Sequence, residues 1–102
     1  MKLIIVTGIV EYRDDIAAMF KKAQVPVFTE SETTGHNNTM PVNLQNNWFG
    51  KDRETYQAVM FFSFTGEEQA TQLMSSVDAH NKQTELSFPI HAFILPVESC
   101  SA

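Results

Sequence analysis

The sequence predicts a single α+β domain in which two β-α-β halves form one four-stranded antiparallel sheet. A ten-residue stretch of strand chemistry at Thr55–Phe64 and two stretches with apolar residues at helical spacing support this prediction. The elements follow one another as β-α-β, a long loop, and β-α-β. That order is the ferredoxin-like βαββαβ arrangement, with both helices on one face of the sheet. At 102 residues, the whole chain, 1–102, has the size of one domain.

The stretch Thr55–Phe64 is the most strand-like part of the chain. One of its faces is wholly apolar, and the other is polar at its ends with Val59 and Phe61 in its middle. A strand with apolar residues on both faces is usually central in a sheet. The next four residues, Thr65–Glu68, fit a capping box in which Thr65 starts a helix.

The first half is predicted to contain a strand at Lys2–Val10, a helix at Glu11–Gln24 and a strand at Val25–Thr34. The first strand is apolar on both faces and is therefore expected in the sheet interior. Pro26 follows the helix and ends it. The second strand becomes polar toward its end, so we expect its far half to be exposed.

The second half continues after a long loop at Gly35–Glu54. A helix is expected at Glu67–Asn81 and a last strand at Pro89–Val97, followed by a short tail. Pro96 cannot donate to a ladder, so it belongs at a strand end or edge. Two helices cover only one face of such a sheet, and the other face is also apolar. Self-association is the simplest way to cover it.

Composition excludes several classes of function. The net charge is −5 and there is no Lys/Arg cluster, which argues against nucleic-acid binding. No apolar run approaches the length of a membrane span. The single cysteine, Cys100, has no partner for an internal disulfide, and a cytoplasmic protein is the default expectation.

No catalytic motif is present, so the chain is not expected to be an enzyme. His80 falls at the end of the second predicted helix, where a cationic imidazole favours the dipole. Nothing near Cys100 would activate its thiol. A soft-metal site would require the fold or an oligomer to bring together Met40, His36, His91 and Cys100.

The long loop allows two interpretations. Its apolar residues include Met40, Val42 and Leu44 as well as Trp48 and Phe49, and these side chains could pin the loop onto its own domain. Alternatively, Trp48 and Phe49, close to Lys51 and Arg53, are anchors for a partner, since aromatic residues and Arg are enriched in interface hot spots.

Two segments carry a family resemblance. Glu30–His36 resembles the end of the second strand of P-II-like signalling proteins, where it leads into their T-loop, and Phe93–Glu98 resembles their final strand. The chain departs from the nitrogen-regulatory members because His80–Ser87 contains no Gly-Asp-Gly-Lys phosphate loop. It is more similar to divergent members found near transporters, some linked to bicarbonate uptake and others to metal efflux.

The resemblance implies a homotrimer with a small-molecule effector, such as an adenine nucleotide or another anion, in a cleft between subunits. By position, it implies one wall with Thr34, Gly35, His36 and Asn37, and another with Lys82 and Phe88. Lys51 or Arg53 would neutralise a phosphate or carboxylate.

Three functions follow as expectations. The first is a non-catalytic trimeric regulator whose loop changes order on ligand binding and docks on a membrane transporter through Trp48 and Phe49. The second is a metal-binding trimer similar to divalent-cation tolerance proteins, with His36, His91 and Cys100 as ligands. The third, a small enzyme with an active site at a subunit boundary, is disfavoured by the lack of a paired acid, base or nucleophile in a loop.

Overall fold

A computed structural model describes residues 1–36, 55–83 and 88–102. Within these ranges the chain forms β1 (Lys2–Ile9), a 3-10 turn η1 (Val10–Tyr12), α1 (Arg13–Lys22), β2 (Thr29–His36), β3 (Thr55–Thr65), α3 (Glu67–Gln83) and β4 (His91–Pro96). No helix in the described ranges is both long and apolar enough to cross a membrane.

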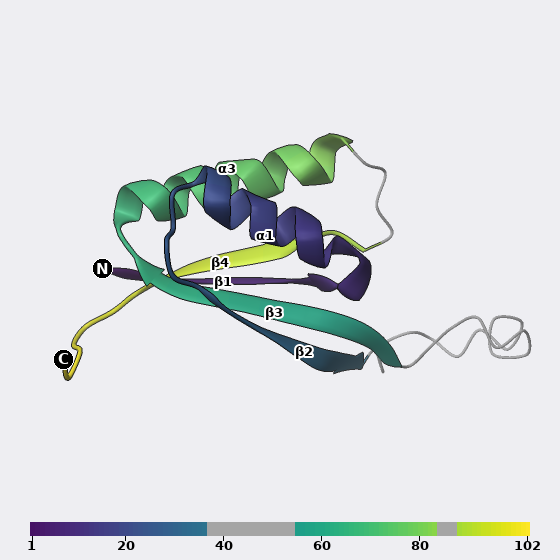
Figure 1. The fold of residues 1–102 in the computed structure, drawn as a ribbon, viewed down its shortest axis with the longest axis horizontal. Helices are drawn as coiled ribbons and strands as arrows, with labels where there is room; N and C mark the ends of the chain where they lie inside the picture. Colours follow the sequence, from purple (N-terminus) through teal and green to yellow (C-terminus); the bar gives the residue numbers. More distant parts are fainter. Residues whose placement is uncertain (37–54, 84–87) are drawn as a thin grey trace, which may run out of the picture.

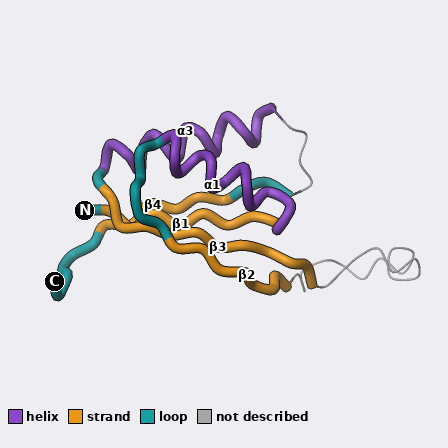
Figure 2. Tube along the Cα trace, in the orientation of Figure 1, coloured by secondary structure: helices purple, strands orange, loops and turns teal. Residues whose placement is uncertain are grey.

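The strands form one antiparallel sheet in the order β2-β3-β1-β4. Both helices lie on the same side of it, and the two chain termini lie at one end of the sheet (Figure 1). Figure 2 shows the two layers, helices against strands. The α+β, ferredoxin-like βαββαβ fold is therefore confirmed, and the predicted central strands, β1 and β3, are the two inner ones.

The core lies between the sheet and the helices. Every second residue of β1 and β3 points into it, because side chains alternate along a strand. Each large side chain buried here contributes about 1.5–3 kcal/mol by leaving water. The largest fully buried side chains are Phe20, Phe61, Ile4, Ile16, Leu73, Ile90, Val6, Val59 and Val77.

The first helix and second strand differ from the predicted ranges. The helix begins after the η1 turn and ends at Lys22, and Gln24 takes a left-handed φ of 61°. The N–H of Val25 donates to the carbonyl of Phe20 at 3.1 Å, so Val25 belongs to the helix exit rather than to a strand. β2 therefore starts four residues later than predicted and runs through Gly35 and His36, two residues assigned to the loop.

The residue that precedes α3, the end of α3 and the start of β4 also differ from the predictions. The helix begins at Glu67, as predicted, but the carbonyl of Gly66 accepts from the N–H of Ala70, so Gly66 rather than Thr65 precedes the first turn. It continues to Gln83. β4 begins at His91 instead of Pro89, because Pro89 has no N–H and the backbone groups of Ile90 bond to a side chain of α3.

The β2 edge is polar and exposed over most of its length, as expected. Arg13 at the start of α1 holds it, with its Nε 2.7 Å from a carboxylate oxygen of Glu30 and its Nη1 3.2 Å from one of Glu32. The hydrogen bond from Arg13 to Glu30, together with the charge of Glu30, raises the pKa of the guanidinium above its usual value. All three side chains are partly exposed, so this cluster orients β2 more than it stabilises the fold.

The face of the sheet opposite the helices, here called the open face, is apolar and uncovered in the single chain. Phe64 is 57% exposed, Phe93 53% and Leu95 41%. The register places these three residues beside apolar residues of the inner strands. Together they form what we call the apolar block: Leu3, Ile5, Phe62, Phe64, Phe93 and Leu95.

The two faces of β3 should respond differently to the same change. Phe61→Ala removes a side chain that is 0% exposed and should lower the free energy of unfolding by about 3–5 kcal/mol. Phe64→Ala removes the same atoms from the open face and should change the stability of the dissociated chain by less than about 0.5 kcal/mol. Urea unfolding of dilute protein measures both values, and equal losses would contradict the assignment of the core face.

Candidate functional site

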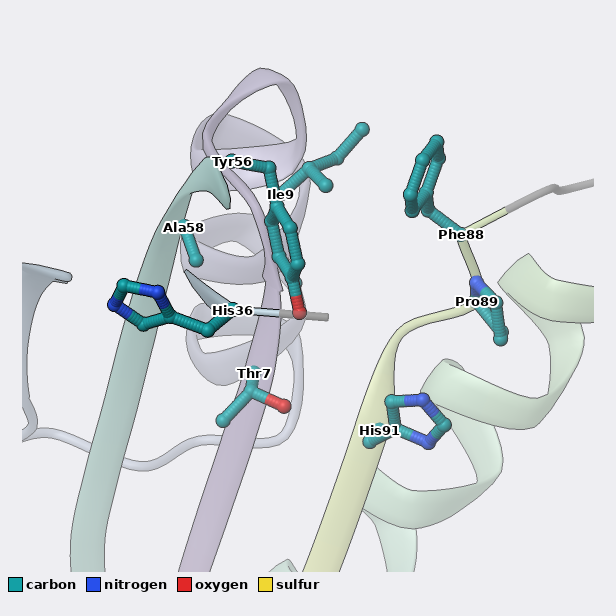
Figure 3. A pocket seen from close by; sticks show the side chains of 9 residues that line it. Thr7, Ile9, His36, Tyr56, Ala58, Phe88, Pro89 and His91 are labelled. Atoms are coloured by element: carbon teal, nitrogen blue, oxygen red, sulfur yellow. The ribbon is translucent and has the colours of Figure 1, made fainter. Parts of the chain in front are cut away.

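A cavity of about 280 Å³ lies on the open face, at the end of the sheet opposite the termini. Its floor comes from the last residues of β1 and from β3, and its walls come from rings on β2, β3 and the approach to β4 (Figure 3). The lining residues are Thr7, Gly8, Ile9, His36, Tyr56, Ala58, Phe88, Pro89 and His91.

The cavity is lined by residues that adjoin both segments outside the described ranges, 37–54 and 84–87. His36 is the last residue of β2 and Tyr56 the second residue of β3, so they stand on either side of the connection 37–54. Phe88 and Pro89 precede β4. In Figure 3 the Tyr56 ring stands between His36 on one side and Phe88, Pro89 and His91 on the other.

Gly35 fixes the position of the Tyr56 ring. The two residues are directly opposite each other in the β2–β3 register. A Cβ added at Gly35 would fall within the atoms of the Tyr56 ring, so the ring lies directly against the backbone of β2. Only glycine leaves this space, and the ring then continues to Phe88, with 6.0 Å between the two ring centroids.

Asn81 fixes the other wall. Its side-chain amide donates to the carbonyl of Ile90 at 2.8 Å and accepts from the N–H of Ile90 at 3.0 Å. The side chain thus occupies both backbone groups of a residue that is only 2% exposed. This contact ties the last turns of α3 to the segment that carries Phe88, Pro89 and His91.

The cavity is aromatic and carries no formal charge from Lys, Arg, Asp or Glu among its described lining residues. Its polar groups are the hydroxyls of Thr7 and Tyr56 and the imidazoles of His36 and His91. His91 is also stacked on Phe93, with 6.5 Å between ring centroids and 22° between planes. Such a lining suits a flat ring with hydrogen-bonding edges.

The structure brings some of the predicted ligand residues to this cavity. His36 and Phe88 line it, and Gly35 supports Tyr56. Thr34 pairs with Gln57 and does not line the cavity, and Lys82 is exposed near the end of α3. Other predicted residues lie outside the described ranges: Asn37, Met40, Trp48, Phe49, Lys51 and Arg53.

Six lining residues were not predicted from the sequence. Five of them come from the ends of β1 and β3, and one precedes β4: Thr7, Gly8, Ile9, Tyr56, Ala58 and Pro89. The alternation of β3, which had placed Tyr56 and Ala58 on one face, was the available signal.

The proposed metal ligands do not meet within one chain. His36 and His91 border the same cavity, but Cys100 lies in the exposed tail at the opposite end of the sheet. In the described ranges, no group of three His, Cys, Asp or Glu side chains is placed to hold a metal ion. His80 lies in the last turn of α3, where its ring contacts Tyr12 and its Nε2 is 3.6 Å from Asp15.

Comparison with known proteins gives a match at the level of the fold alone. No family model and no curated protein matches the sequence. The crystal structure of a DUF3240 family protein from Shewanella baltica OS155 is similar, with a TM-score of 0.67. The two chains are 13% identical, and the match covers 99% of this chain and 93% of the other.

Removing the Asn81 side chain should loosen the cavity wall. Asn81→Ala leaves a buried N–H and C=O of Ile90 without their partner, so the free energy of unfolding should fall by about 1–3 kcal/mol. Asn81→Asp keeps the acceptor but loses the donor, so its free energy of unfolding should lie between that of the unchanged protein and that of Asn81→Ala. Denaturant unfolding measures the series, and an unchanged midpoint for Asn81→Ala would show that the contact carries no stability.

Proposed function

We propose that this chain is a non-catalytic, cytoplasmic regulator of the P-II-like type, assembled as a homotrimer. In this proposal a small effector binds at clefts between subunits, and the connection 37–54 carries the response to a membrane transporter. Trp48 and Phe49 would be the contacts with that partner.

One observation carries the proposal. The cavity is lined by the residues that flank the connection on both sides, His36 and Tyr56. A ligand that contacts both residues binds at the base of that connection, so its binding free energy can bias the conformation there. In this proposal the effector site would therefore lie next to both ends of the segment that carries the response.

The effector we propose is an adenine nucleotide. The rings of Tyr56 and Phe88 offer a surface for a base, since stacking on aromatic side chains contributes about 1–3 kcal/mol per base. The described lining residues have no cation for the phosphates. Lys82, or Lys51 and Arg53 from the connection, would supply that charge.

The open face supports the proposed assembly. The apolar block leaves three large side chains more than two-fifths exposed in the single chain. Because each side chain is already about half buried, covering the rest of it would contribute about 0.7–1.5 kcal/mol. The cavity lies on the same face, so a neighbouring copy would approach its rim.

Native mass spectrometry with added ATP, ADP, AMP or zinc tests the effector. We expect a three-chain species that takes up one nucleotide per chain. Tyr56→Ala and Phe88→Ala should each weaken that binding about 5- to 150-fold through lost stacking. Tyr56→Phe keeps the ring and should bind nearly as well as the unchanged protein; uptake that is insensitive to both alanine variants would place the ligand elsewhere.

Placing a charge in the apolar block should prevent assembly. Phe93→Glu would bury a carboxylate where the described face offers no cation, so we expect a folded monomer in sedimentation velocity. Gln72→Glu makes the same charge change on an exposed position of α3 and should leave the oligomer intact. If Phe93→Glu assembles as the unchanged protein does, the open face is not the interface.

A metal-binding trimer is the second candidate function, because His36 and His91 border one cavity. Structural zinc sites usually have four ligands, so two imidazoles are an incomplete set within the described part of one chain. A neighbouring copy would have to complete it. A three-chain species that takes up zinc but no nucleotide, and loses zinc in His36→Ala/His91→Ala, would favour this function.

A further inference from the structure

The open face is ordered in rows that cross the strands, and the rows differ in polarity. The residue-by-residue register from β2 through β3 and β1 to β4 defines each row. The two rows nearest the termini hold the apolar block. The next row toward the cavity, which we call the third row, contains, from β2 to β4, Ser31, Met60, Thr7 and His91.

Counted from the termini, the third row holds the first polar open-face residues of β1 and β4, Thr7 and His91. Its two ends are Ser31 and His91. They lie on the two edge strands, β2 and β4, which Figure 2 shows on opposite sides of the sheet. Both side chains are exposed in the single chain. His91 is next to the apolar block because its ring stacks on Phe93.

The lack of charge on this face favours a second copy of the chain as its occupant. The described strands place no Lys, Arg, Asp or Glu side chain on it, since the acids of β2 alternate to the other side, where Arg13 pairs with them. A charged partner surface would lose its water here without gaining a counter-ion. The same uncharged face of another copy meets no such cost, whereas the net charge of −5 opposes contact between the acidic remaining surfaces.

Symmetry then relates the two ends of the third row. This step rests on the self-association proposed above. In a closed ring whose rotation axis runs along the strands, all copies stand at the same height, and the β4 edge of one copy lies beside the β2 edge of the next. Each row then continues into the same row of the neighbour. The third row of one copy ends at His91, and that of the next begins at Ser31.

We propose that His91 of each copy forms a hydrogen bond with the Ser31 hydroxyl of the next copy, and that this pair aligns the copies with their strands along the rotation axis. An imidazole at the border of a buried apolar face needs a polar partner, because a buried group without one is costly. If the axis ran across the strands instead, β4 would meet β4. His91 would then face β4 of the second copy. The open-face residues of that strand, His91, Phe93 and Leu95, carry no hydroxyl.

Engineered disulfides test this geometry directly. Within one chain, Ser31 and His91 are three strand spacings apart, about 14 Å, which is too far for a disulfide. In a Cys100→Ser background, we expect the Ser31→Cys/His91→Cys double variant to form covalently linked oligomers on oxidation. Each single variant should stay unlinked on a non-reducing gel, because it would present only one of the two thiols at the boundary.

Each other outcome overturns a defined part of the inference. Linking of the His91→Cys single variant would show that β4 meets β4. An oligomer in native mass spectrometry whose double variant does not link would overturn the inference and leave the proposed trimer standing. A chain that is monomeric at every concentration would overturn both.

A second measurement separates the hydrogen bond from mere proximity. His91→Leu should raise the concentration at which the oligomer dissociates about tenfold, whereas His91→Gln, which keeps a donor and an acceptor, should recover most of that loss. Circular dichroism verifies that both variants fold. Equal dissociation of the two variants would overturn the role of hydrogen bonding.

Discussion

Two helices cannot cover both faces of a four-stranded sheet, and this constraint determines the rest of the structure. α1 and α3 bury one side of β1 and β3 around Phe61. The alternation of the same strands then leaves Phe62 and Phe64 on the other side. The core and the exposed apolar block are thus two consequences of a single pattern, and the cavity lies at the end of the face that the helices leave open.

The sequence allowed prediction of the fold class, the helical layer and the two central strands, because these depend on periodicity alone. The first and last residues of the helices and strands were harder to predict from the sequence, since tertiary contacts decide them. Gln24 adopts a left-handed conformation that delays β2, and Asn81 occupies the backbone of Ile90 so that β4 starts late. Gly66 precedes α3 although the Thr65–Glu68 pattern favoured Thr65, since a local motif does not decide where a long strand ends.

The candidate site was predictable only in part, for a related reason. Gly35, His36 and Phe88 could be assigned by position along the chain, because they flank recognisable connections. Thr7 and His91, and likewise Ile9 and Ala58, share the cavity because of cross-strand register, which pairs residues distant in sequence. Other predicted site residues belong to the connection 37–54, which lies outside the described residues: Lys51, Arg53, Trp48 and Phe49.

The contact between Gly35 and Tyr56 has a consequence for the dynamics of the ribbon formed by β2 and β3. The ends of such ribbons usually open and close readily, and their amide hydrogens exchange quickly with solvent. Here an aromatic ring lies on the backbone near the last residue pairs of the ribbon and excludes water from that side. Slow amide exchange should therefore extend nearly to His36. A disturbance beginning beyond that residue would reach the body of the protein through the rings around the cavity, rather than by progressive separation of the two strands.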